Sequence, residues 1–301
     1  MTKPQSDPED LRHGIITKCI AGEYSVYIDG VIITAAARGK FRSDGIVPVT
    51  GDRVVVSGRE GSFVIKDVLE RRNILPRPAV ANIEVLIITL SPCRPEPDLM
   101  LADLLVAYCR RQDIMPVICV NKRDLSPEAA VEICGQYVKS NLTALSMSAL
   151  LDQDVVSLFG IIKGRITCLA GQSAAGKSTL INRLMPGVGL KTGQLSKKTD
   201  RGRHTTRYTE LLIDDSGVML IDTPGFSLLE LMSVPPEEFT ALYYEYGEYS
   251  PGCRYRGCAH IGEPGCAVEA AAEKNILSAE RYERYRRLYA DIKDNWRKRY
   301  D

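Results

Sequence analysis

The sequence has no long hydrophobic run and almost no net charge. Its longest apolar segment, residues 85–90, is far too short to cross a bilayer, and the opening MTKPQSDPEDLR contains no apolar stretch of the signal-peptide kind. We therefore expect a soluble protein of the cytoplasm without membrane contact. The formal charge is +1, so the chain as a whole supplies no cationic field, which argues against a nonspecific DNA-binding protein. Contacts with nucleic acid have to come from local basic patches.

Histidine is scarce, with three residues, and cysteine occurs in an odd number, nine. Six cysteines stand singly in apolar surroundings, which is typical of buried free thiols. They are Cys19, Cys93, Cys109, Cys119, Cys134 and Cys168.

The other three cysteines form the pattern Cys253-x₄-Cys258-x-His260-x₅-Cys266, set among glycines and prolines. Three thiolates and one imidazole on tight turns predict a tetrahedral structural zinc site without an open position. A disulfide would leave one thiol unpaired and does not suit a reducing compartment. Buried thiols without a metal are the alternative interpretation.

Residues 11–72 contain short stretches of period-2 alternation separated by turn residues, and Asp29-Gly30 is typical of a hairpin turn. The stretches are residues 14–17, 24–28, 31–34, 52–56 and 62–65. Five short strands in so small a segment predict a closed all-β barrel of the OB-fold type, and we expect this domain to span residues 1–72. Its basic face, or equally a merely solvated surface, would be formed by Arg38, Lys40, Arg42 and Arg53.

The pattern changes after a proline-punctuated segment at residues 71–78, which we interpret as a linker. An apolar strand at 83–90, a helix at 97–112 and a second apolar strand at 115–120 then predict a βαβ unit of a parallel sheet.

The four residues that follow the second strand are Asn121, Lys122, Arg123 and Asp124. They fit N-K-x-D, the sequence with which GTPases read guanine. A carboxylate accepts two hydrogen bonds, and guanine offers a matching pair of donors at N1 and N2 that adenine lacks, so Asp124 would favour GTP over ATP. Asn121 would tie this loop to a phosphate-binding loop, and the stem of Lys122 would lie over the base.

A helix at 126–141 and a strand at 143–147 are expected next, and the strand leads into Ser148-Ala149. In GTPases such a Ser-Ala pair supports the base through backbone contacts.

The segment from Gly171 to Ser178, GQSAAGKS, fits G-x-x-x-x-G-K-[ST], the phosphate-binding loop of nucleoside triphosphatases. A strand at 165–170 precedes it and a helix follows, which is the setting that the loop requires. Lys177 would reach the β- and γ-phosphates, and Ser178 would bind Mg²⁺. The residues expected at the phosphates are Gly171, Gln172, Ser173, Ala174, Ala175, Gly176, Lys177, Ser178 and Thr179.

A long, basic, glycine-containing segment at residues 187–207 follows this helix, and loops of such length are usually functional or disordered. It ends in His204-Thr205-Thr206, where a GTPase needs a threonine to complete the Mg²⁺ shell. The pattern leaves open whether Thr205 or Thr206 has this role.

A hairpin at residues 208–221 delivers Asp222-Thr223-Pro224-Gly225. Asp222 would hold Mg²⁺ through water, and Gly225 would sense the γ-phosphate. N-K-x-D and Ser-Ala precede the phosphate loop here, whereas conventional GTPases begin with that loop. Circular permutation accounts for this order, because the original termini can be joined and the chain opened elsewhere while the site is kept. We expect the permuted GTPase domain at residues 73–235.

The last segment, residues 278–301, has a helical pattern and belongs to a zinc-binding helical domain expected at 236–301. From Arg281 onward it carries eight basic and four acidic residues with aromatic residues between them. This interleaving suits RNA, because rings stack on bases and arginine pairs with phosphate. A helix that packs its rings on the zinc module is the alternative. The aromatic residues are Tyr282, Tyr285, Tyr289, Trp296 and Tyr300.

Together these motifs resemble one family, the circularly permuted, small-ribosomal-subunit-dependent GTPases known as RsgA or YjeQ. The resemblance covers nearly the whole chain as an OB-fold, an α/β P-loop GTPase domain and a zinc module. It implies hydrolysis of GTP to GDP and phosphate, stimulated by the small ribosomal subunit, and a role in late maturation of that subunit. It also implies contacts of the barrel and the zinc module with ribosomal RNA. We expect a monomer, because no spare apolar stretch asks for a partner.

The loop GQSAAGKS departs from the GQSGVGKS more usual in the family, but the changed residues are small and we expect binding to survive. Phe226 stands where Ras-type enzymes carry a water-orienting glutamine, and the resemblance implies His204 as its replacement. Slow intrinsic turnover, accelerated on the ribosome, is therefore expected.

Two other classes of function remain open. One is a stand-alone nucleotide switch with a protein partner, whose RNA affinity would be weak. The other is an RNA-binding protein with a vestigial nucleotide site, for which Lys177→Ala would leave function intact.

Overall fold

The computed structural model describes residues 11–37, 41, 45–59, 61–76, 79–187, 209–222 and 234–298. The chain divides into two compact units. Unit 1 comprises residues 1–84, 162–168 and 193–224, and unit 2 comprises residues 85–161, 169–192 and 225–301. Within the described residues, no helix combines the length and the apolar character needed to cross a membrane. The domain limits expected at residues 72 and 235 stay a prediction.

Unit 1 begins with a five-stranded barrel. Its strands are β1 (Leu11–Ile20), β2 (Glu23–Ile28), β3 (Val31–Ala37), β4 (Arg53–Ser57) and β5 (Phe63–Val68). The sheet closes because β1 pairs with both β2 and β4, and β5 pairs with both β3 and β4. The alternating apolar residues fill the interior, with Ile16, Val26 and Val54 at 0 % exposure. The predicted barrel is confirmed.

The segment interpreted as a linker is partly a hairpin, so that interpretation is wrong for its second half. β6 (Ile74–Pro76) pairs antiparallel with β7 (Ala79–Ala81). The side chain of Asn73 closes the hairpin: its Oδ1 accepts from the Ile83 N–H at 3.0 Å, and its Nδ2 donates to the Ile83 carbonyl at 2.8 Å. The prolines of this segment favoured the interpretation as a linker. Pro76 is nevertheless compatible with the hairpin, because it lies at a strand end where no amide donor is needed.

The other strands of unit 1 belong to the predicted nucleotide domain. β12 (Glu210–Ile213) and β13 (Met219–Asp222) form the expected antiparallel hairpin, and β13 runs parallel to β11 (Ile166–Ala170). The turn of the hairpin is held by Asp214, whose carboxylate accepts from the N–H groups of Ser216 and Val218.

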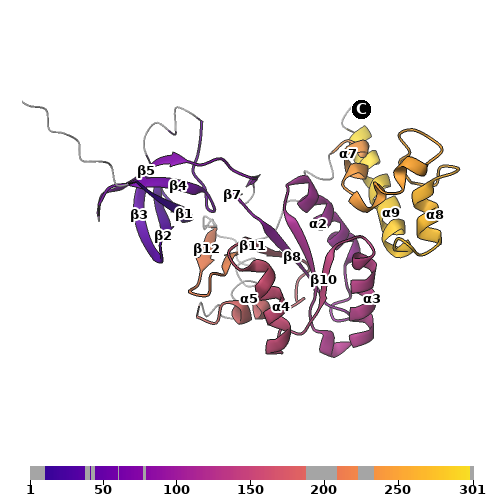
Figure 1. The fold of residues 1–301 in the computed structure, drawn as a ribbon, viewed down its shortest axis with the longest axis horizontal. Coiled ribbons are helices and arrows are strands. Elements are labelled where there is room, and N and C mark those ends of the chain that lie inside the picture. Colours follow the sequence, from indigo (N-terminus) through magenta and orange to yellow (C-terminus); the bar gives the residue numbers. More distant parts are fainter. Residues whose placement is uncertain are drawn as a thin grey trace, which may run out of the picture. The chain divides into compact units, whose positions relative to one another are not determined.

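Unit 2 contains a parallel sheet with helices. β8 (Val85–Leu90), β9 (Met115–Val120) and β10 (Thr143–Ser146) pair in parallel, as predicted. All of β8 is buried, which explains its continuous apolar sequence. The helices beside these strands in Figure 1 are α2 (Leu99–Arg111) and α3 (Pro127–Val138). A further helix, α4 (Asp152–Ile162), was not predicted, although Val155, Leu158, Phe159 and Ile162 have the i, i+3, i+4, i+7 spacing of an amphipathic helix.

The C-terminal part of unit 2 consists of short helices around a long one. They are α7 (Pro236–Ala241), η3 (Tyr244–Tyr246), η4 (Ser250–Gly252), α8 (Ala267–Glu273) and α9 (Ala279–Arg297). The predicted terminal helix is confirmed as α9, which begins at a serine cap: Ser278 Oγ accepts from the Arg281 N–H at 3.1 Å.

The rings of α9 turn inward. Tyr285 is fully buried, stacks on Phe239 with ring centroids 5.9 Å apart, and meets Tyr246 edge-on at 5.1 Å. Its hydroxyl donates to the carbonyl of Ala259 in the cysteine-containing turn. Tyr282 and Tyr289 are also buried, so packing on the C-terminal module accounts for three of the five aromatic residues.

Four of the six scattered cysteines are buried, as predicted: Cys109, Cys119, Cys134 and Cys168. Cys19 and Cys93 are only half-buried. Burial raises the pKa of the Cys19 thiol to about 11, so this thiol stays protonated at neutral pH.

Candidate nucleotide-binding site and metal centre

The loop between β11 and α5 (Lys177–Leu184) has a backbone that only glycine allows at two positions. Gly171 has φ +123° and Gly176 has φ +97°. A Cβ on Gly171 would lie 2.1 Å from the Thr89 carbonyl oxygen, and one on Gly176 would lie 2.3 Å from Nδ2 of Asn121. Both glycines are therefore required for their torsion and for the space they leave. Because α5 begins at Lys177, its first N–H groups belong to the loop, as in phosphate-binding sites.

Lys177 folds back over this loop. Its Nζ donates to the carbonyls of Gly171 at 2.8 Å and Gln172 at 2.7 Å. Burial lowers the pKa of its ammonium group, because removal from water disfavours the charged form. A phosphate close to this cation would offset the loss of hydration.

Asn121 joins three loops. Its Nδ2 donates to the Ala175 carbonyl in the phosphate loop at 3.1 Å, and its Oδ1 accepts from the Ala149 N–H at 2.8 Å. The side chain is 2 % exposed, so both bonds are shielded from water. The expected contact between the N-K-x-D and phosphate loops is present, and the same side chain also holds the Ser-Ala pair.

The remaining N-K-x-D residues form a single turn, η1 (Arg123–Leu125). Lys122, with φ +63°, precedes it and extends its side chain to the phosphate loop, where Nζ donates to the Ala174 carbonyl at 2.7 Å. Asp124 is exposed, so its carboxylate is accessible to a base.

Two further side chains hold these loops. Gln172 points toward the segment before α2: it accepts from the Asp98 N–H at 2.7 Å and donates to the Glu96 carbonyl at 2.6 Å. Arg183 of α5 donates to the carbonyls of Ala149 at 3.1 Å and Leu150 at 2.9 Å. Arg183 was not predicted from the sequence, and no spacing signals it, because it lies beyond the motif on an ordinary helix.

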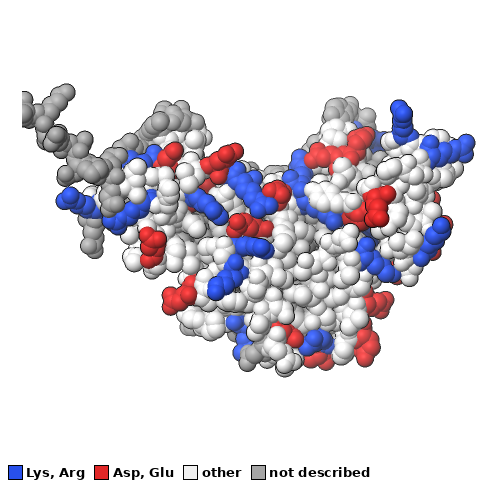
Figure 2. All heavy atoms as spheres, in the orientation of Figure 1, with Lys and Arg blue, Asp and Glu red and all other residues white. Residues whose placement is uncertain are grey.

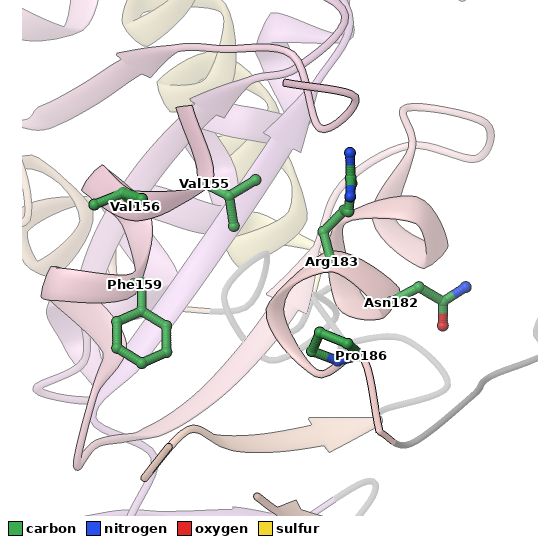
Figure 3. A pocket seen from close by; sticks show the side chains of 6 residues that line it. All are labelled: Val155, Val156, Phe159, Asn182, Arg183 and Pro186. Carbon is green, nitrogen blue, oxygen red and sulfur yellow. The ribbon is translucent and has the colours of Figure 1, made fainter. Parts of the chain in front are cut away.

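A mainly apolar cavity of about 320 Å³ lies between α4 and α5 (Figure 3). Its lining contains none of the residues expected to bind nucleotide. The side chains that line it are Val155, Val156, Phe159, Asn182, Arg183 and Pro186.

Asp222 is the last residue of β13 in unit 1. The predicted residues outside the described part of the chain are His204, Thr205, Thr206, Gly225 and Phe226, and, in the barrel, Arg38, Lys40 and Arg42.

The four predicted metal ligands come together. The ligand atoms of Cys253, Cys258, His260 and Cys266 all lie within 4.8 Å of one another. Nδ1 of His260 is 3.7 Å from the Cys253 sulfur and 3.4 Å from the Cys266 sulfur, while Nε2 is 3.1 Å from the Ser250 hydroxyl. One ring nitrogen thus faces the sulfurs and the other has a polar partner, as in metal-bound imidazoles.

Backbone amides point at the sulfurs. The Ala267 N–H donates to Cys253 at 3.3 Å, and the Glu269 N–H donates to Cys266 at 3.4 Å. Such bonds favour the thiolate, which is the form that binds metal. Without a metal, burial raises the pKa of the Cys258 thiol to about 12, so a metal has to displace protons. The cluster can hold a metal ion, and three sulfurs with one nitrogen are a donor set that fits zinc.

Comparison with known proteins gives one result over nearly the whole chain. The family models for the RsgA N-terminal domain and the RsgA GTPase match residues 13–62 and 68–232. The small ribosomal subunit biogenesis GTPase RsgA of Caldanaerobacter subterraneus is 39 % identical over 291 residues, covering 95 % of this chain and 98 % of its own length. Its counterpart in Geobacillus thermodenitrificans is 36 % identical over 289 residues, covering 94 % and 98 %.

Two solved structures are also similar. YjeQ from Thermotoga maritima superposes with a TM-score of 0.81 at 31 % identity, covering 94 % of this chain and 98 % of that one. YloQ, described as a circularly permuted GTPase, superposes with a TM-score of 0.80 at 29 % identity, covering 97 % and 98 %. The predicted fold class, a barrel followed by a permuted GTPase domain and a Cys/His module, is confirmed.

Proposed function

The chain belongs to the RsgA GTPase family, and from this premise we propose that it hydrolyses GTP to GDP and phosphate in the late maturation of the small ribosomal subunit. The observation that carries this proposal is the position of Asn121. Its side chain connects the phosphate loop to the Ser-Ala loop and stands in the same N-K-x-D segment as the exposed Asp124. The loops that follow β9, β10 and β11 thus offer phosphate donors and a guanine acceptor together, at the strand ends where such sheets bind ligands.

Each part of the site has a chemical task. The N–H groups of residues 171–179 and the Lys177 ammonium would bind the phosphates, and Asp124 would read the base with Lys122 alongside. Ser148 and Ala149 would support the base through their backbone. Gly225 would sense the γ-phosphate.

Ser178 and Asp222 would hold Mg²⁺, since hydroxyl and carboxylate oxygens suit this ion, which neutralises phosphate charge when bound. His204 would accept a hydrogen bond from the attacking water, because an imidazole can do so and the apolar Phe226 cannot. Thr205 or Thr206 would complete the shell of the ion.

We assign zinc to the cysteine and histidine cluster and contacts with ribosomal RNA to the barrel and the C-terminal module. Tyr255 supports this assignment: it is 48 % exposed between the first two cysteines, and the Arg254 guanidinium lies 5.5 Å from its ring. An exposed ring flanked by Arg254 and Arg256 suits base stacking and phosphate contacts. Figure 2 shows lysine and arginine side chains on this C-terminal region with acidic side chains among them.

We do not assign Arg281 and Arg284 to RNA contacts, because both form ion pairs with Asp103 inside unit 2. We further propose that the protein works as a monomer in the cytoplasm, where its thiols stay reduced.

The test is GTP turnover measured with and without purified small ribosomal subunits. We expect the subunits to raise kcat at least about tenfold, as partners of slow GTPases do. ATP should not be hydrolysed, and Lys177→Ala should abolish turnover in both conditions. His204→Ala should lose the stimulation while GDP affinity is kept. Equal slow rates with and without subunits would contradict the coupling to the ribosome, and unchanged stimulation in His204→Ala would contradict the role of that residue.

A further inference from the structure

An ion pair anchors the N-K-x-D loop to helix α4. Nη2 of Arg123, the variable residue of the motif, lies 2.9 Å from Oδ1 and 2.8 Å from Oδ2 of Asp154. The Asp154 side chain is 10 % exposed and that of Arg123 34 % exposed. Because the carboxylate is largely removed from water, this pair is held more firmly than an ordinary surface pair.

The same carboxylate also holds the Ser-Ala loop. The backbone N–H of Ser148 donates to Oδ2 of Asp154 at 2.8 Å. Arg123 reinforces this connection, since its Nη1 donates to the Ser146 carbonyl at 3.2 Å and its backbone N–H donates to the Met147 carbonyl at 3.0 Å. One side chain on α4 therefore fixes both loops that are expected to surround the base.

Asp124 itself has little packing to hold it. It lies in the single turn η1, none of whose three residues is buried, and its neighbour Leu125 is 50 % exposed. The position of the Asp124 carboxylate depends on what anchors the residue before it. We propose that Asp154, acting through Arg123 and Ser148, is a positioning residue for guanine recognition. This inference rests on the proposed role of Asp124 in reading the base.

The chemistry of the base supplies a specific readout. Guanine donates from N1 and from its 2-amino group, whereas hypoxanthine keeps N1–H and lacks the amino group. A misplaced carboxylate on Asp124 loses the paired geometry and with it the advantage of the second donor. The preference for GDP over inosine diphosphate (IDP), the nucleotide that carries hypoxanthine, then falls. A general loosening of the fold would instead weaken the binding of both nucleotides alike.

The experiment measures the dissociation constants of GDP and IDP for the full chain by calorimetry, with the melting temperature as a control. Asp154→Asn keeps an acceptor for Ser148 and removes the charge that faces Arg123. We expect its GDP affinity to fall roughly fivefold. Its GDP/IDP ratio, which is the affinity for GDP divided by the affinity for IDP, should fall about threefold, within the range found for coupled neighbours. Arg123→Gln should give a similar loss, and the double variant should be no worse than either single one.

A matched control is Arg111→Gln. It breaks an ion pair of comparable length to Glu238, 2.6 Å, with side chains 32 % and 40 % exposed, and we expect the GDP/IDP ratio to stay unchanged. Arg123→Gln alters a partly exposed side chain, so it keeps the inference testable if Asp154→Asn does not fold.

Asp124→Asn distinguishes the base-reading role of Asp124 from the positioning role of Asp154. If it loses the preference for guanine while Asp154→Asn and Arg123→Gln keep the wild-type GDP/IDP ratio, the positioning role is overturned and the base-reading role of Asp124 stands. If Asp124→Asn also keeps the preference, both fail. A lower GDP/IDP affinity ratio in Asp124→Asn, Asp154→Asn and Arg123→Gln, with an unchanged ratio in Arg111→Gln, supports the inference.

Discussion

Asp103 of α2 is fully buried and is held by two arginines of α9. Nε of Arg281 donates to Oδ1 at 2.9 Å, and Nε of Arg284 donates to Oδ2. Glu245 is the second acid of this network and accepts from Arg110 at 2.7 Å and pairs with Arg281. Burial and the neighbouring Arg281 lower the pKa of Arg110 to about 10, so the Arg110 guanidinium is still charged at neutral pH.

Asp103→Asn should be among the most destabilising conservative changes in unit 2. It leaves three largely buried guanidiniums opposite a single carboxylate, and the free energy of unfolding should fall by about 3 kcal/mol, as when one partner of a buried pair is removed. Urea denaturation followed by circular dichroism measures the loss. Arg111→Gln, at an exposed pair, should cost less than about 1 kcal/mol. Equal losses for the two variants would refute the stabilising role of the network.

The candidate metal centre is built from the ends of short helices and the turn between them. Cys253 directly follows η4, and Cys266 caps the N-terminus of α8 by accepting from the Glu269 N–H. Tyr285 of α9 donates to Ala259 within the same turn. These elements have few residues of their own, so we expect a metal to supply much of their stability.

Removal of the metal should therefore unfold this module. A strong chelator should release one zinc ion per chain, lower the helical circular dichroism and lower the melting temperature, because zinc binding of about 10 kcal/mol is coupled to folding in such sites. Cys258→Ser should lose the metal as purified, whereas Cys19→Ser, at a half-buried thiol of the barrel, should keep it. An unchanged melting temperature in the chelated protein would show that the cluster is not a structural metal site.

The net charge of the entire chain, +1, limits the ways in which it could make the proposed contacts with ribosomal RNA. With no overall cationic field, contacts with phosphates have to come from local groups such as Arg254 and Arg256. Each such contact releases counterions, so affinity depends on salt in proportion to the number of contacts.

Binding to purified small subunits should weaken steeply as salt rises. We expect Arg254→Gln to reduce the slope of log affinity against log salt by about one, as the loss of one phosphate contact does. Arg111→Gln, a charge outside the proposed RNA surface, should leave the slope unchanged. A nearly flat salt dependence would favour contacts with ribosomal proteins over contacts with RNA.

Local chemistry let the sequence alone specify several features. A phosphate-binding loop needs glycine at positions 171 and 176 and a lysine at the start of a helix. Recognition of guanine needs an aspartate, and a zinc site needs closely spaced thiols and an imidazole. Each of these requirements falls on residues that are near one another in the chain. Period-2 alternation likewise identified the barrel strands. The backbone of the phosphate loop, the cysteine and histidine cluster and the barrel strands could be predicted because their physical causes act over a few residues.

Only the tertiary structure decided which distant side chains meet. A charged residue on a helix has the same local pattern whether it faces water or a partner, so nothing in the sequence marked Asp154 as the partner of Arg123, or Asp103 as the partner of Arg281. The tyrosines of α9 were equally ambiguous until packing on Phe239 and Tyr246 removed them from solvent. Burial depends on what the rest of the chain brings to a surface, and that is a property of packing, not of local sequence.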